Sequence, residues 1–160
     1  MKDLQLIDAK ISSELPPSKL IPKFQIAVRK LVDTWHKYKP NDSLAGTRKQ
    51  DLQDLQSILQ QYQQFSSEEL QQKFWQGYFE GKSNRRTIKK STNLTPSLLS
   101  SLFSNEKKEA FALGVKTGWQ YARLKSYLVR IENIEKEQLK RYKEMMLSQK
   151  ANPRNLDYTF

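Results

Sequence analysis

Residues 105–149 read NEKKEAFALGVKTGWQYARLKSYLVRIENIEKEQLKRYKEMMLSQ, and this stretch decides the fold. It holds no proline, its apolar residues recur every three or four positions, and Ser104 or Asn105 can cap its start. The pattern predicts one long C-terminal helix of roughly 65 Å, with Asn133 as the place where it could break. Between Ala110 and Ile131 most of the circumference is apolar, which indicates a helix at the centre of the molecule.

The same stretch changes character after residue 132. From 133 to 150 it is rich in Glu, Lys, Arg and Gln, and its apolar seam is limited to Leu139, Tyr142, Met145 and Met146. A helix this polar does not belong in a core, so we expect residues 133–150 to project and to act as a coiled-coil or partner-docking helix. Residues 151–160 are expected to form an irregular tail, which ends in Tyr158 and Phe160.

The rest of the chain predicts shorter helices separated by proline, glycine and polar residues. These helices are expected at 3–14, at 17–38, after the capping boxes Thr47–Gln50 and Ser66–Glu69, and after Thr95-Pro96. Gly81 is expected to end the helix that Ser66 opens. We therefore predict an all-α fold: a compact helical bundle of five or six helices in a single domain over residues 1–150. The helix at 17–38 and the last helix should supply most of the core.

The chain contains one internal resemblance, at a constant offset of 37 residues. Ser67…Phe74-x-x-Gly77-x-x-x-Gly81…Arg86 matches Ser104…Phe111-x-x-Gly114-x-x-x-Gly118…Arg123. A duplicated helical unit would explain the match, and so would chance, because only five positions agree. Each Gly-x-x-x-Gly motif leaves a groove along its helix. In a soluble bundle this predicts close packing of another helix.

Charge is distributed unevenly along the 160 residues, whose net charge is +11. Residues 1–80 hold 11 Lys/Arg and 10 Asp/Glu, whereas residues 81–160 hold 17 and 7. This asymmetry predicts a polyanionic partner for the second half. Nucleic acid is the first candidate, and an anionic membrane or an acidic protein follows. The alternative is that the positive charge only keeps the protein in solution.

Catalytic chemistry finds little support in the sequence. Without cysteine, thiolate catalysis and cysteine-ligated zinc are excluded, and the single histidine, His36, falls on the polar side of its helix. The triplet Gly81-Lys82-Ser83 does not form a phosphate loop, because the upstream Gly77 is one residue too close. We predict no enzyme activity, no metal and no cofactor. With no apolar run of about 18 residues and no signal-peptide core, we expect no membrane span and a cytoplasmic location.

The strongest binding signal is a basic loop at residues 82–93. Five cations stand within nine residues without an acid, among polar neighbours that can also bind phosphate oxygens: Lys82, Arg85, Arg86, Lys89 and Lys90. Such a loop can follow a phosphate backbone and gain free energy from counterion release. The alternative is a solvated connector between helices.

A second signal lies in the long helix. Lys116, Arg123 and Arg130 are spaced by seven residues, so they share one face at intervals of about 10 Å; we call them the cationic edge. Tyr127 falls on this face and Trp119 at its border. Arginine binds phosphate through two hydrogen bonds, and an aromatic ring can stack on an unpaired base. The alternative is an ordinary exposed edge whose aromatic residues face the core.

These signals predict a non-catalytic, sequence-tolerant protein that binds the backbone of RNA or DNA. It would be a small helical subunit of a larger nucleoprotein complex, and no motif for sequence readout is present. The first rival is a protein–protein interaction or adaptor module that docks on an acidic partner through its C-terminal helix and tail. The second is a binder of anionic membrane surfaces through the helix at 17–38.

Overall fold

The computed structural model describes residues 11–83 and 105–151, and all regular structure in these ranges is α-helical. The helices are, in order, α1 (Pro17–Tyr38), α2 (Ala45–Tyr62), α3 (Glu68–Ser83) and α6 (Asn105–Ala151). The all-α fold is confirmed, but the described ranges hold four helices where five or six were predicted. The helix predicted at 3–14 is not formed over its described end, residues 11–14. Its first part and the helix predicted after Thr95-Pro96 lie outside the described residues.

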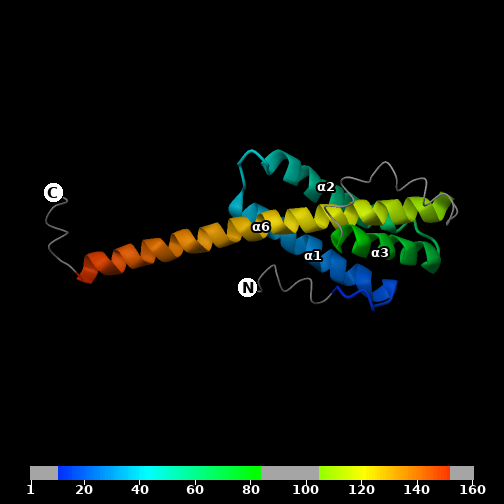
Figure 1. Ribbon diagram of the computed structural model, residues 1–160, viewed down its shortest axis with the longest axis horizontal. Helices are drawn as coiled ribbons and strands as arrows, with labels where there is room; N and C mark the ends of the chain where they lie inside the picture. The colour runs from blue at the N-terminus through cyan, green and yellow to red at the C-terminus, as the bar shows by residue number, and fades with distance from the viewer. Residues whose placement is uncertain (1–10, 84–104, 152–160) are drawn as a thin grey trace.

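Helix α6 is the axis of the molecule. Its 47 residues run over about 70 Å, as one helix that continues through Asn133, where the sequence allowed a break. Helices α1, α2 and α3 gather around its first half, and its last part extends away from them (Figure 1). Over the described helices, none is long and apolar enough to cross a bilayer.

Helices α3 and α6 pack backbone to backbone through their glycines. A β-carbon on Gly77 would collide with the carbonyl oxygen of Phe111, and one on Gly114 with the carbonyl oxygen of Phe74. Gly81 and Gly118 repeat this arrangement one turn later. The contacts map onto each other through the offset of 37 residues, so the two helices run parallel and are related by a pseudo-twofold axis. Close packing at the two motifs is confirmed. Gly81 does not end α3, because its missing side chain serves this contact.

Aromatic rings fill the space between α1, α3 and α6. Phe24 of α1 lies edge-on to Trp75 and Tyr78 of α3, with centroids 5.7 and 5.6 Å apart, and 6.0 Å from Tyr121 of α6. Trp75 Nε1 donates a hydrogen bond of 2.9 Å to the hydroxyl of Tyr62 in α2. The four helices therefore share one core, to which α3 contributes Phe74, Trp75 and Tyr78 beside the predicted contributions of α1 and α6.

The helix ends agree with the sequence only in part. Helix α1 begins at Pro17 and stops before Pro40, as predicted. Helix α2 begins at Ala45, so the capping box predicted at Thr47 is wrong, and its N-cap residue Leu44 offers no side-chain hydrogen bond to the helix. Asp42 Oδ1 accepts the N–H of Leu44 at 3.0 Å in the turn before the helix. In α3 the hydroxyl of Ser67, one residue after the predicted Ser66, accepts the N–H of Leu70 at 3.2 Å.

Candidate nucleic-acid interface

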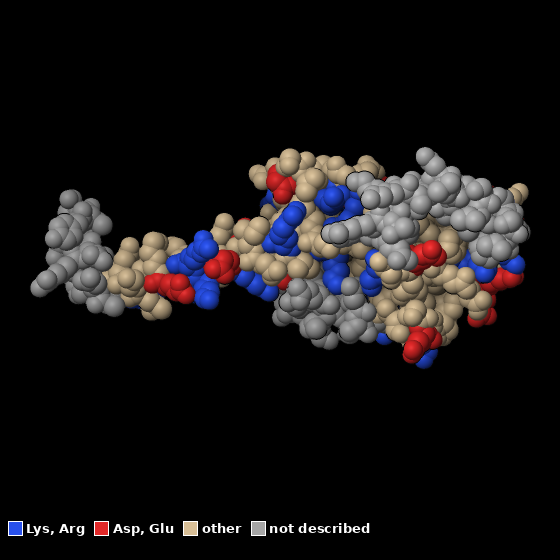
Figure 2. All heavy atoms as spheres, in the orientation of Figure 1, with Lys and Arg blue, Asp and Glu red and all other residues tan. Residues whose placement is uncertain are grey.

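The cationic edge lies where α6 runs antiparallel to α2. Lys and Arg side chains spread over the middle of the molecule, where these two helices meet (Figure 2). Acids of α2 and of the turn before it also reach this boundary. Asp51 and Asp54 of α2 contact Arg123 and Gln120, and Asp42 of the turn contacts Tyr127. The predicted residues therefore fall into two groups, those that contact α2 and those that face solvent.

Arg123 belongs to the first group. Its Nε and Nη2 donate to Asp51 Oδ2 and Oδ1 at 2.7 and 2.6 Å, and Arg48 Nη1 lies 3.2 Å from the same carboxylate. The side chain of Asp51 is 1% exposed and that of Arg123 is 21% exposed. A buried carboxylate needs such donors, because leaving water costs several kcal/mol. Arg123 therefore fastens α2 to α6.

The acids of α2 were not foreseen from the sequence, although one signal was present. Asp51 falls in helical register with Leu55, Ile58 and Tyr62, which are all buried. A carboxylate on an apolar stripe requires a partner from another element. The sequence does not say which of the cations that partner is, since Arg123 lies 72 residues away.

A second carboxylate extends this network. Partial burial raises the pKa of the Asp54 carboxyl, but several groups act in the opposite direction and prevail, so the pKa lies below its ordinary value. The amides of Gln120 and Gln50 donate to it at 2.8 and 2.9 Å, and the charges of Lys116 and Arg123 add to the effect. Asp54 is therefore ionised at neutral pH, and it partly offsets the charge of Lys116.

The two aromatic residues of the predicted site contribute to packing. The guanidinium of Arg123 lies 3.9 Å from the centroid of Trp119 and covers one face of that ring. Tyr127 is buried, and its hydroxyl donates to Asp42 Oδ1 at 2.9 Å. Burial and the neighbouring Asp42 raise the pKa of Tyr127 to about 12. Tyr127 thus has its hydroxyl engaged and its ring within the core.

Lys116 and Arg130 form the second group. Both side chains are exposed, and neither forms an ion pair within the described helices. The guanidinium of Arg130 lies 5.9 Å from the Tyr127 ring, at the border of the core. Fourteen residues separate the two cations, which is about 21 Å along the helix. They can therefore contact separate phosphates of one extended polyanion.

Lys82 lies on another side of α6. Its Nζ is 5.9 and 5.6 Å from the ring centroids of Tyr78 and Tyr121. Tyr121 and Arg123 are two residues apart and thus about 200° apart around the helix. Lys82 therefore does not join the cationic edge. The other cations of the predicted loop, Arg85, Arg86, Lys89 and Lys90, lie outside the described residues.

The described ranges show no group of residues that indicates a metal site. Within residues 11–83 and 105–151 no three His, Asp or Glu side chains come together as a metal site. His36 is exposed near the end of α1. No protein-family model, curated protein or solved structure matches this chain.

Proposed function

We propose that this protein binds the phosphate backbone of RNA or DNA without catalysis and without sequence readout, as a small helical subunit of a larger nucleoprotein complex. The observation that supports this most is the pair of exposed cations Lys116 and Arg130 on one face of α6, neither of which forms an ion pair with another described residue. Four further cations without an acid, between residues 84 and 104, are tethered to the same body by α3 and α6. Contacts of this kind give affinity through counterion release and do not distinguish bases.

In this proposal Arg123 has a positioning role. Its pairing with Asp51 holds α2 against α6, and that contact keeps the face carrying Lys116 and Arg130 rigid. Trp119 and Tyr127 support the same contact from the side of α6. The cations that meet phosphate are therefore Lys116 and Arg130, together with Arg85, Arg86, Lys89 and Lys90.

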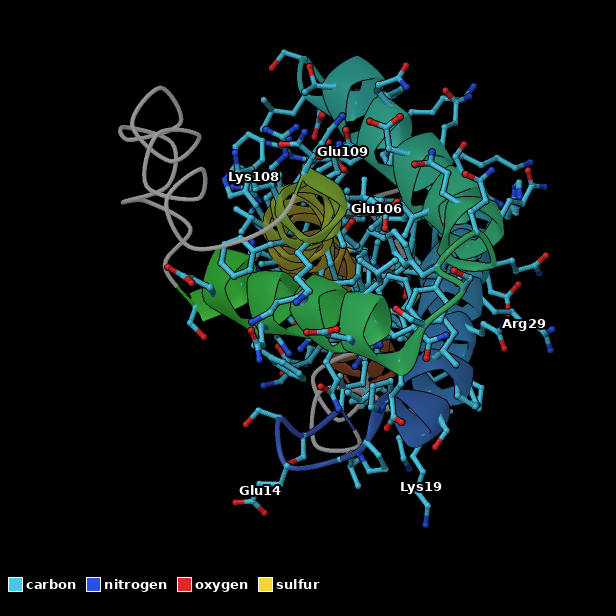
Figure 3. The ribbon with its side chains drawn as sticks, turned by 90° about the vertical axis from the view of Figure 1, so that its right-hand side faces the viewer. Glu14, Lys19, Arg29, Glu106, Lys108 and Glu109 are labelled. Atoms are coloured by element: carbon cyan, nitrogen blue, oxygen red, sulfur yellow. The ribbon has the colours of Figure 1, made fainter. Side chains whose placement is uncertain are left out.

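The test compares two charge reversals of equal size. K116E/R130E changes the proposed interface, and K19E/R29E changes two exposed cations of α1 that point away from α6 (Figure 3). Binding to fluorescent single-stranded and duplex RNA and DNA is followed by anisotropy between about 50 and 200 mM salt. We expect K116E/R130E to weaken binding equally for all sequences of one type and to lower the salt slope by about two. The control K19E/R29E should change the affinity and the salt slope far less.

Two results would contradict the proposal. One is the absence of binding to any of the four nucleic acids at the lowest salt. The other is an equal loss of affinity in both charge-reversal variants, because this would show a response to net charge alone. Which nucleic acid binds best is an outcome of the same measurement.

A further inference from the structure

The last part of α6, residues 133–151, is an arm without packing partners among the described residues. Among the described residues Glu132 is the last buried one, and every residue from Asn133 to Ser148 is exposed. The arm is about 28 Å long and leaves the body as a straight continuation of α6 (Figure 1).

Large apolar side chains line this arm although no described residue covers them. Leu147 is 65% exposed and Tyr142 56% exposed, and four other large apolar side chains of the arm are exposed as well. With about 100° between successive residues, five of the six fall within about 140° of the circumference. We call these five the arm seam: Ile134, Leu139, Tyr142, Met145 and Met146. A continuous exposed apolar strip on a helix is the usual signature of a surface that takes another helix.

One border of the arm seam is cationic. Lys136, Lys143 and Lys150 follow each other at spacing seven, so they stay beside the seam over its whole length. Lys136 lies 3.3 Å from Glu132, but its side chain is 61% exposed, and such a surface pair contributes little. We call these three residues the lysine border. It requires carboxylates on whatever helix lies along the seam.

A second copy of this chain does not supply them. In a parallel pair the lysine border would face Gln138 and Met145 of the other copy, and Glu135, which lies inside the seam, would meet its own equivalent. In an antiparallel pair the lysine border would face itself. Like charges in these flanking positions disfavour pairing.

We propose that the arm docks an amphipathic helix of another protein, which brings an apolar seam flanked by glutamate or aspartate. The apolar side chains would supply affinity, with Met145 and Met146 adapting to the shape of the partner. The lysine border would select the partner and its orientation through charge pairs. The arm then joins the protein to its complex, while the body remains open to nucleic acid.

The experiment uses the full chain and two synthetic helices of about three heptads, with Leu at the a and d positions. One peptide carries Glu at its flanking e and g positions, and the other carries Lys there. Repulsion between like charges keeps each peptide from pairing with itself. Binding is measured by anisotropy, and we expect the acidic peptide to bind about tenfold more tightly than the basic one, which equals about 1.4 kcal/mol.

Two variants test the lysine border and one tests the seam. K136E/K143E/K150E should reverse the preference in favour of the basic peptide. Lys140→Glu, a reversal on the far side of the arm, should leave the preference intact. L139S/Y142S should abolish binding of both peptides. K116E/R130E should keep full peptide affinity, so failure of this inference is separable from failure of the nucleic-acid proposal.

Four outcomes would overturn the inference. Equal binding of both peptides, or an equal response to Lys140→Glu and to the triple variant, would remove the role of the lysine border. A dimer in sedimentation that L139S/Y142S dissolves would make a second copy the occupant. Co-sedimentation with phosphatidylserine vesicles that L139S/Y142S abolishes would make a lipid surface the occupant.

Discussion

Helix α6 passes without a break through two environments. In its first half Arg123 binds a carboxylate that is 1% exposed, through two hydrogen bonds below 2.8 Å. In the arm Arg141 lies 3.5 Å from Glu137, and its side chain is 76% exposed. Both arginines belong to the same helix and both have an acidic partner. Only the first connects two elements that are far apart in the sequence.

The difference separates two ways of stabilising a helix. The first half is held by tertiary contacts: glycines that admit α3, aromatic rings that pack on α1, and acids that come from α2. The arm has local i,i+4 pairs, each of which contributes a few tenths of a kcal/mol. It is also continuous with the anchored first half of α6. Substitutions in the first half should therefore change stability, and those in the arm should change binding.

The largest effect is expected at the buried ion pair. Arg123→Ala leaves Asp51 in the core with Arg48 at 3.2 Å and a long hydrogen bond of 3.4 Å from the Gln120 amide, so the free energy of unfolding should fall by about 3 kcal/mol. Arg141→Ala removes an exposed pair and should cost less than about 0.5 kcal/mol. Urea denaturation of both variants checks this. Equal losses would mean that Asp51 is satisfied without Arg123, and the contrast between the two halves would fail.

A smaller effect is expected where the backbones of α3 and α6 meet. Gly114→Ala places a methyl group against backbone atoms of Phe74 and Tyr78, so the helices must separate, and we expect a loss of about 2 kcal/mol. Gly46→Ala is the matched control, because Gly46 lies inside α2 and its β-carbon would meet nothing within 4 Å. It should raise stability by up to about 1 kcal/mol through helix propensity.

Thermal unfolding followed by circular dichroism distinguishes these two glycine substitutions. The same change from glycine to alanine is expected to lower stability at position 114 and to raise it at position 46. If Gly114→Ala also raised stability, the backbones of α3 and α6 would not pack as closely at Gly114 as the structure shows.

The features that could be predicted from the sequence are those that depend on local pattern. Helical periodicity gave the extent of α1 and α6, the change in polarity after residue 132 indicated the arm, and the paired glycines predicted close packing. The start of α2 could not be predicted in this way. Thr47 has a side chain that can cap, but α2 begins two residues earlier at Ala45, after a turn in which Asp42 accepts the N–H of Leu44.

The candidate site shows where local pattern stops being informative. The spacing of seven placed Lys116, Arg123 and Arg130 on one face, and α6 is one continuous helix over that span. It could not show that α2 would cover part of that face and bind Arg123 through an acid 72 residues away. Whether Tyr127 faces solvent or core also depends on where α1 and α2 pack. Such outcomes are set by tertiary contacts, which residue spacing does not contain.

The smallest effect is expected at Tyr127, and its pH dependence again contrasts the two halves of α6. Its pKa of about 12 lies above the ordinary value of about 10, so folding favours the neutral phenol. The resulting stability is fully present below pH 10 and is lost as pH rises through about 12. Tyr127→Phe should cost about 1 kcal/mol at pH 7, because the hydrogen bond to Asp42 is lost, and should flatten the decline above pH 10.

Tyr142→Phe in the arm is the control for this measurement, since the exposed phenol of Tyr142 has no tertiary partner among the described residues. It should change neither the stability at pH 7 nor its decline at alkaline pH. Urea midpoints of the three proteins between about pH 7 and 12 provide the comparison. An unchanged alkaline decline in Tyr127→Phe would show that other groups of the core, such as Tyr62, whose pKa burial also raises, set the limit. The hydroxyl of Tyr127 would then contribute only its hydrogen bond to Asp42, in the turn before α2.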